Sequence, residues 1–342
     1  MTDRAFGLRP MAASLGGFDD RGGIALFMVA AMVVMRRLTC VAGRRGFMYA
    51  NARTPDRGEL EHIGRVLGGW QDDDGPLHLH PGDLGWYSLR GSAATAAATR
   101  VWSDGDTIVA IALLDGPDLL RFAMDPARCQ DTSLASRIVK DIEDPSAGVI
   151  GPGSATIEAR GAAALAEQLA RHRWLPDEPW TPLRRNLAVP VEASDLRIEI
   201  VEPERTEEWV SVHWSAFRGT PMPDDRLRNF VDGWCAAADA PFLDAARILL
   251  VRDEKDRPVA VSAVWSAGAA RPGLIEPLGV HQEHRGRGYG AIMTRAAAAT
   301  LREMGSSSAT VCAESSNAGA IETYRAAGFV ADPEVADWRR DA

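Results

Sequence analysis

The sequence predicts an α/β (α+β) fold made of two tandem copies of one domain, each a mixed, twisted sheet flanked by helices. The chain has 342 residues, 46% hydrophobic and 25% charged, which is typical of a globular protein long enough for two domains. Strand-like runs alternate along the chain with segments that have a helical period of hydrophobic residues. The same order of elements occurs twice, which indicates tandem copies.

The second half of the chain shows the pattern more clearly. Its expected elements are a hairpin with strands at 246–254 and 259–267, a strand at 273–280, a helix at 291–305, a strand at 308–314 and a helix before Gly328. Residues 256–258, Asp-Arg-Pro, supply the hairpin turn, and Gly305 ends the first helix. A glycine loop separates the third strand from that helix, so the order is that of an α/β crossover.

The first half repeats this order. Its expected elements are a hairpin-like pair at 101–114, a strand at 118–126, a helix at 133–144, a strand at 154–160 and a helix at 161–174. Met124 and Arg173 are 49 positions apart, and the corresponding Val280 and Gly328 are 48 positions apart. One strand in each copy also begins with Ser-Ala-Thr, so we interpret the two halves as copies of one domain.

The repeat divides the chain into three parts. A strand at 183–189 is expected to close a degenerate first domain at 55–191, and a second domain follows at 192–342. Residues 1–54 form an N-terminal extension, expected to lie outside the main fold and to be disordered. Its apolar run, 24–34, is shorter than the ~20 residues that span a bilayer, and no small-residue cleavage site follows it. A helix at a membrane surface or on a partner is the alternative.

Charge and cysteine content argue against several classes of protein. The net charge of −9 disfavours nucleic acid as the main partner, because nucleic-acid-binding domains present a basic face. The cysteines form no CxxC pair and the chain has no HExxH motif, so we expect neither a bound metal nor a disulfide framework. These features suit the reducing cytoplasm. The cysteines are Cys40, Cys129, Cys235 and Cys312.

Residues 284–290, His-Arg-Gly-Arg-Gly-Tyr-Gly, form the most informative loop of the chain. The loop lies between a strand and a helix, where unpaired backbone N–H groups and the helix dipole favour a phosphate group. Its glycines allow a ligand to approach closely, and Arg285 and Arg287 add positive charge. The corresponding stretch of the first copy, 127–135, has no glycine, so we expect the first copy to have lost this function.

The spacing excludes two common phosphate-binding motifs. A GxGxxG motif would require glycine at the position of Met293, and the chain has no GK[ST] sequence. The loop instead has the pattern R-x-x-G-x-G, at Arg285, Gly288 and Gly290. This pattern resembles the motif with which the GNAT superfamily of N-acetyltransferases binds the pyrophosphate of acetyl-CoA.

Two neighbouring stretches carry the same resemblance. Residues 275–284, IEPLGVHQEH, are similar to the strand of the family whose end binds pantetheine. Asn317, Tyr324 and a Gly-Phe turn at 328–329 are spaced like the next motif of the family. The degenerate first copy resembles the tandem two-domain acetyltransferases of actinobacteria. The motifs cover about 273–330, and the resemblance in fold covers about 195–342 and, more faintly, 57–191.

The resemblance implies acetyl-CoA as co-substrate and assigns residues to it. Val280 and Gln282 would bind pantetheine through backbone groups, and Asn317 would cap a helix and contact the coenzyme arm. The pyrophosphate loop comprises Arg285, Gly286, Arg287, Gly288, Tyr289 and Gly290. The alternatives are an ordinary strand end for Val280 and Gln282, and a glycine-rich turn for the loop.

Two residues are candidates for proton transfer. By resemblance, Tyr324 would protonate the thiolate of coenzyme A as it leaves, and a phenol can supply a proton to a thiolate whose pKa is ~8.5. Glu276, the carboxylate of the strand at 273–280, would take the proton of the attacking amine. The alternatives are a core aromatic for Tyr324, and an edge or solvent-facing residue for Glu276 because Pro277 disturbs strand pairing.

Three further residues have open interpretations. His213 and Phe217 belong to an early helix of the second copy, which in the related fold lines the acceptor site; an amphipathic core stripe is the alternative. Cys312 lies on a strand, where apolar neighbours would raise its pKa, so we expect a buried thiol and not a nucleophile.

Together these features predict an acyl-CoA-dependent N-acyltransferase that transfers acetyl from acetyl-CoA to a primary amine by direct attack in a ternary complex. We expect a small-molecule amine acceptor, no nucleic acid, no membrane span, no metal, and a monomer or homodimer in the cytoplasm. The alternative is a catalytically silent sensor or scaffold that binds CoA or acyl-CoA, since one copy has already lost its loop. An acyl donor larger than acetyl stays open, because the loop binds only the nucleotide end.

Overall fold

The computed structural model describes residues 51–192 and 194–342, which belong to one unit of the chain, Tyr49–Ala342. The apolar run at 24–34, Cys40 and most of the predicted N-terminal extension lie outside the described residues. Within the described part of the chain, no helix is both long enough and apolar enough to cross a membrane.

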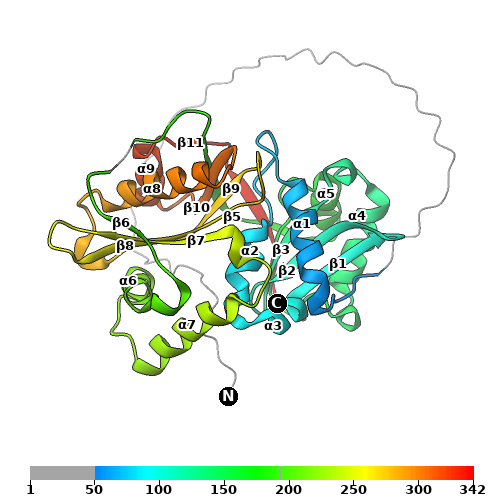
Figure 1. The fold of residues 1–342 in the computed structure, drawn as a ribbon. Coiled ribbons are helices and arrows are strands. Elements are labelled where there is room, and N and C mark those ends of the chain that lie inside the picture. Colours follow the sequence, from blue (N-terminus) through cyan, green and yellow to red (C-terminus); the bar gives the residue numbers. More distant parts are fainter. Residues whose placement is uncertain (1–50, 193) are drawn as a thin grey trace, which may run out of the picture. The chain divides into compact units, whose positions relative to one another are not determined.

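The first half contains the strands and helices that its sequence pattern predicts. In chain order, its elements are α1 (Leu60–Trp70), α2 (Pro81–Tyr87), α3 (Ser92–Ala98), β1 (Thr99–Asp104), β2 (Thr107–Leu114), β3 (Leu119–Met124), α4 (Thr132–Glu143), β4 (Ala155–Glu158), α5 (Ala163–Arg171) and β5 (Leu175–Asn186) (Figure 1). Helix α4 illustrates the pattern: Leu134, Ile138 and Ile142 recur every four residues and are buried on one face.

The second half repeats the arrangement. Its elements are β6 (Ile198–Ile200), α6 (Glu207–Arg218), α7 (Asp224–Ala237), β7 (Ala246–Arg252), β8 (Pro258–Trp265), β9 (Gly273–Val280), α8 (Tyr289–Glu303), β10 (Ser308–Glu314), α9 (Ala318–Ala326), β11 (Val330–Ala331) and β12 (Val335–Arg340). Helix α8 begins two residues earlier than the pattern predicts, directly after Gly288, whose φ of +82° ends the loop.

The two halves exchange their last long strands within one sheet. The strand order is β1-β2-β3-β4-β12-β5-β10-β9-β8-β7-β6, so β5 of the first half lies beside β10, and β12 of the second half lies beside β4. The strand predicted at 183–189 therefore belongs to the sheet of the second half, where Leu183 is opposite Val311. Strand pattern alone does not specify the partner of a strand. The domain boundary at 191/192 stays a prediction.

The sheet curves strongly between β3 and β9. Four strands separate these two in the strand order. In a flat sheet they would be about 24 Å apart, at ~4.8 Å per step. Nevertheless a guanidinium nitrogen of Arg121 on β3 lies 3.4 Å from a carboxylate oxygen of Glu276 on β9. The side of the sheet that carries both residues is called the inner face below.

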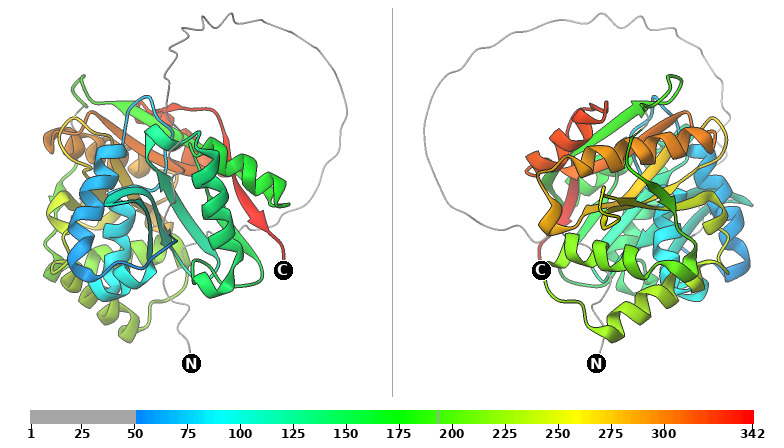
Figure 2. Two further views of the ribbon diagram at one scale, coloured as in Figure 1. Left: turned by 90° about the vertical axis from the view of Figure 1, so that its right-hand side faces the viewer. Right: turned by 60° about the vertical axis from the view of Figure 1, so that its left-hand side comes forward.

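Helices cover both sides of the second half (Figures 1 and 2). On one side, Met293, Ala297 and Leu301 of α8 share a core with Val264 and Ile275 of the strands. Helices α6 and α7 pack on the opposite side.

Helix α2 of the first half joins α6 and α7 there. A Cβ added at Gly82 or Gly85 would lie 2.5 Å or 2.3 Å from the side chain of Trp265 on β8. The glycines of α2 therefore allow the first half to pack closely on the sheet of the second.

Candidate active site

The loop at 284–290 leaves a helix N-terminus with unused hydrogen-bond donors. Gly286 and Gly288 have φ values of +74° and +82°, and a Cβ at either position would meet no atom within 4 Å. The backbone N–H groups of residues 286–291 have no acceptor among the described residues, and Gly288 offers no side-chain cap. Such donors at the start of a 15-residue helix can bind an anionic group.

Arg285, Arg287 and Gly290 of the loop each contact a neighbouring part of the structure. Arg285 donates a hydrogen bond to the carbonyl of Ala216, with a distance of 2.6 Å, and so attaches the loop to α6. A guanidinium nitrogen of Arg287 lies 3.5 Å from Nδ1 of His284. A Cβ at Gly290 would lie 2.8 Å from Cγ2 of Thr323, so packing of α8 against α9 requires this glycine.

In the first half, aspartate carboxylates accept hydrogen bonds from the backbone N–H groups at the corresponding positions. Asp131 accepts hydrogen bonds from the backbone N–H groups of Ser133 and Leu134, both at 3.0 Å, at the start of α4. Asp125 accepts a hydrogen bond from the N–H of Ala127 at 2.9 Å. A phosphate at this position would have to displace a carboxylate, which supports the prediction that the first copy has lost the function of the loop.

Strands β9 and β10 separate just before the loop. They pair only at Gly273 with Ala309 and at Leu274 with Thr310. Beyond these pairs, β9 stays paired with β8 and β10 stays paired with β5. An extended ligand arm therefore has room beside the end of β9, near Val280. The backbone N–H of Gln282, just beyond the strand, donates a hydrogen bond to Oγ of Ser215 on α6 at 3.2 Å.

Two candidate residues belong to α9 and its N-cap. Asn317 caps this helix as predicted, because its side chain accepts a hydrogen bond from the N–H of Ala320 at 3.1 Å. Tyr324 is buried, and burial raises the pKa of its phenol well above the ordinary value. Burial likewise raises the pKa of the Cys312 thiol to about 12, and the carboxylate of Glu276 adds to both effects. Both side chains therefore stay protonated near neutral pH.

Glu276 is half-buried and held in place from several sides. Its backbone carbonyl accepts a hydrogen bond from Nε1 of Trp265 at 2.7 Å. The pairing of β8 with β9 shifts register opposite Glu276 and Pro277, so the predicted disturbance by the proline is present. The side chain is paired with Arg121, which also contacts Asp83 at 2.7 Å.

A second arginine of the first half reaches the same region. Arg160 makes two hydrogen bonds of 2.9 Å to Asp337 on β12, and another of its nitrogens lies 3.6 Å from Sγ of Cys312. The sequence pattern did not indicate a role for Arg121 or Arg160. Arg121 stands out in the sequence only as a charged residue inside the apolar strand at 118–126. Its ion pair with Glu276 depends on the curvature of the sheet, which the sequence pattern does not show.

An aromatic cluster fills the space between α2, α6 and α7. Trp209 stacks on His213 with ring centres 5.1 Å apart, and Trp86 lies 5.7 Å from the same histidine. Burial lowers the pKa of His213 to about 3, and neither ring nitrogen has a hydrogen-bond partner among the described residues. His213 therefore belongs to the core. Phe217 is 39% exposed and lies against Gly279 of β9.

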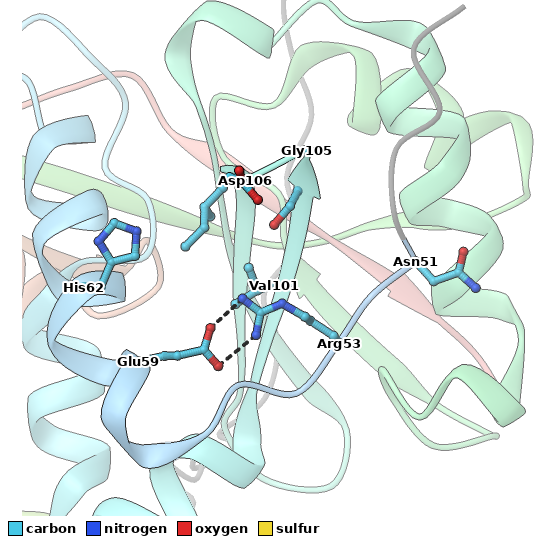
Figure 3. Close-up of a pocket in the computed structure, with 9 residues that line it drawn as sticks. Asn51, Arg53, Glu59, His62, Val101, Gly105 and Asp106 are labelled. Carbon is cyan, nitrogen blue, oxygen red and sulfur yellow. Dashed lines mark hydrogen bonds and ion pairs between the residues drawn. The ribbon is translucent and has the colours of Figure 1, made fainter.

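A separate pocket of about 340 Å³ lies at the outer edge of the first half (Figure 3). Its lining residues are Asn51, Arg53, Glu59, His62, Val101, Ser103, Gly105, Asp106 and Ile108. Arg53 and Glu59 are paired across it at 2.6 Å and 2.9 Å. The pocket shares no residue with the loop or with the opening between β9 and β10.

In the described residues, no group of three or more potential ligand side chains is arranged to hold a metal.

Comparison with known proteins agrees with the geometry. The profile of the acetyltransferase (GNAT) family matches residues 205–329. Mycothiol acetyltransferase of Segniliparus rotundus is 26% identical over 212 residues, which are 57% of this chain and 75% of that protein.

Two solved structures share the fold. A GCN5-related N-acetyltransferase from Sphaerobacter thermophilus has a TM-score of 0.52 at 18% identity, over 85% of this chain and 95% of that one. A tandem GNAT protein from the clavulanic acid biosynthesis pathway has a TM-score of 0.54 at 17% identity, over 86% and 98%. The family profile matches the segment that contains the loop, the opening and α9, and together with the mycothiol acetyltransferase relative it supports an N-acetyltransferase of the GNAT family.

Proposed function

We propose that the protein transfers an acetyl group from acetyl-CoA to a primary amine of a small molecule by direct attack in a ternary complex. The observation that carries the proposal is the set of unpaired N–H groups at residues 286–291, next to the opening between β9 and β10. These donors suit a pyrophosphate, and Val280 and Gln282 are proposed to bind pantetheine through their backbone; for Gln282 the N–H would have to leave its hydrogen bond to Oγ of Ser215. The thioester supplies the activated acetyl group.

Glu276 and Tyr324 are proposed as base and acid. Glu276 takes the proton that the amine loses as it attacks. Tyr324 donates a proton or hydrogen bond to the departing thiolate, and its raised pKa keeps the phenol in the required protonated state. Cys312 is a neutral thiol at pH 7, which supports direct attack without a covalent acetyl-enzyme. The acceptor approaches along the inner face, where the first half contributes Arg121.

Calorimetric titration with acetyl-CoA and CoA tests the binding part of the proposal. Gly288 and Gly305 flank α8, with φ values of +82° and +85° and open space around both. Gly288→Trp should therefore abolish binding, while Gly305→Trp controls for backbone strain and should bind normally. Equal loss in both variants would show that strain, and not the loop, controls binding.

Thioester cleavage with a panel of amines tests the chemical part. Acetylation of any amine that depends on Glu276 supports the transferase. Binding of acetyl-CoA without turnover of a broad panel would instead favour a sensor or scaffold that binds CoA.

A further inference from the structure

The last turn of α6 lies against the end of β9 and the start of the glycine loop. A Cβ added at Gly279 would lie 2.8 Å from Cβ of Ala216, so the missing side chain allows the helix to approach the strand closely. The backbone N–H of Gln282 donates its hydrogen bond to Oγ of Ser215 on this turn. Three positions further on, Arg285 donates to the carbonyl of Ala216. These contacts recur every third residue, at 279, 282 and 285, and join α6 to the segment that leads into the loop.

Arg285 supplies a hydrogen-bond donor that the end of this helix lacks. Helix α6 ends at Arg218 and is followed by Gly219, whose φ is +64°. The last four carbonyl groups of a helix have no partner within the helix. The carbonyl of Ala216 is one of these, and it accepts the hydrogen bond of Arg285 at 2.6 Å. A cation at this end is also favoured by the helix dipole, so Arg285 caps the C-terminus of α6.

The first part of α6 is fixed by buried contacts. Trp209 is fully buried, and its Nε1 donates a hydrogen bond to the carbonyl of Ser262 on β8 at 3.2 Å. Its ring centre lies 6.3 Å from that of Trp86 on α2. The last turn is less enclosed, since Ser215 and Ala216 are only half-buried. Close packing leaves the first part of the helix little freedom, and the last turn is therefore the part whose position the loop can control.

We propose that Arg285 is a positioning residue that couples the glycine loop to the last turn of α6. Coenzyme bound to the N–H groups of 286–291 fixes the loop, and Arg285 passes this constraint to the helix. The turn lies on β9 three residues beyond Glu276, so its position affects the side from which the candidate base is reached. If pantetheine takes the N–H of Gln282 away from α6, Arg285 is the polar link that remains. This inference rests on the proposed transferase function and adds a residue to it.

Hydrogen–deuterium exchange with and without CoA, measured by mass spectrometry, tests the coupling. In the wild type, saturating CoA should slow exchange at 286–291 and in the last turn of α6, at 215–218. Arg285→Gln should keep the protection of the loop and lose that of the turn. Arg285→Lys should restore part of it, because an ammonium group can still donate to Ala216. Arg287→Gln is the matched control: it removes the same charge from the same loop, but Arg287 contacts His284, so both segments should be protected.

Exchange without CoA tests the link itself. Loss of one hydrogen bond should make the last turn of α6 exchange about fivefold faster in Arg285→Gln than in the wild type and Arg287→Gln. This result supports the positioning role even if the wild type binds no CoA, an outcome that would count against the transferase function alone. Equal exchange rates in the three proteins, or protection of the turn by CoA that survives Arg285→Gln, overturns the inference. Thermal melting curves verify that the variants are folded.

Discussion

Arg121 and Glu276 occupy equivalent positions in the two halves and form an ion pair with each other. In the first half, Leu119 is opposite Thr156, and in the second half Leu274 is opposite Thr310, so the residue two positions later is Arg121 in one and Glu276 in the other. Their charged groups are 3.4 Å apart. The position that carries the candidate base in the second half thus carries its partner in the first.

Replacing Arg121 should destabilise the protein strongly. Arg121→Leu removes the cation that pairs with Asp83 and Glu276 and leaves Asp115 with Arg90 alone, and we expect a loss of about 3 kcal/mol in the free energy of unfolding. Urea denaturation measures the loss. Arg65→Leu removes an exposed ion pair with Glu61 and should change stability little. Similar effects of the two substitutions would contradict the importance of the pair between the halves.

Glu276→Gln should reduce kcat/KM for the amine by about two orders of magnitude, the usual contribution of a general base. Binding of acetyl-CoA should persist, because Glu276 is outside the loop. Steady-state kinetics and calorimetry separate the two effects. Glu254→Gln, an exposed carboxylate in the turn between β7 and β8, is the control. Unchanged turnover in Glu276→Gln would exclude this residue as the base.

Tyr324→Phe should lower kcat about 100-fold while KM for acetyl-CoA changes little, because the phenol acts on the leaving thiolate and not on the nucleotide. Single-turnover kinetics measures the chemical step directly. The same substitution at Tyr87, in α2 of the first half, should leave kcat near that of the wild type. Full activity of Tyr324→Phe would show that Tyr324 is a buried aromatic residue of the core with no role in the chemical step.

His213 should make the protein sensitive to acid. Its pKa is about 3 in the folded protein against an ordinary value of 6.5, so below pH 6.5 only the unfolded chain takes up the proton. The contribution of neutral His213 to the free energy of unfolding is therefore fully present above pH 6.5, and it decreases as the pH falls from 6.5 toward 3. Between about pH 7 and about pH 5 the loss is about 2 kcal/mol, at 1.36 kcal/mol per pH unit.

His213→Phe should remove this part of the pH dependence and also the two nitrogens without hydrogen-bond partners. Urea denaturation at the two pH values should show the stability of the variant falling less than that of the wild type. His62→Phe, an exposed histidine of α1, controls for the loss of one titrating group. Parallel pH profiles of wild type and His213→Phe would falsify the assignment.

The first half should not bind acetyl-CoA. Asp131 caps α4, so Asp131→Ala should cost about 1 kcal/mol of stability and leave the binding stoichiometry at one acetyl-CoA per chain. Gln130→Ala, at the exposed neighbouring position, should affect neither quantity. Two bound molecules per wild-type chain in calorimetry would show that the first loop remains a binding site.

Local pattern predicted the elements and the loop well. The hydrophobic period located α4, α8 and β7–β10 to within a few residues, and Asn317 caps α9 as expected. The glycines at 286 and 288 have the positive φ values that a ligand-binding turn requires. Such features depend on residues close in sequence, which propensity and spacing describe directly.

The pairing of the last strands was not predictable in this way. A strand at 183–189 was expected to close the first copy, but the strand found there, β5 (Leu175–Asn186), lies between β12 and β10. Two antiparallel strands of similar composition can pair at either position, and the choice depends on how both halves pack. The roles of Glu276, Tyr324 and the loop residues in binding and catalysis stay predictions.

The sequence by itself determined which residue types lie at the end of β9, in the glycine loop and on α9, because these motifs are local. Only the tertiary structure decided that Arg121, Glu158 and Arg160 of the first half lie on the same inner face as Glu276. The reason is physical: curvature of the sheet and exchange of β5 and β12 arise from the packing of many strands, and no short stretch of sequence encodes a contact between residues 155 positions apart.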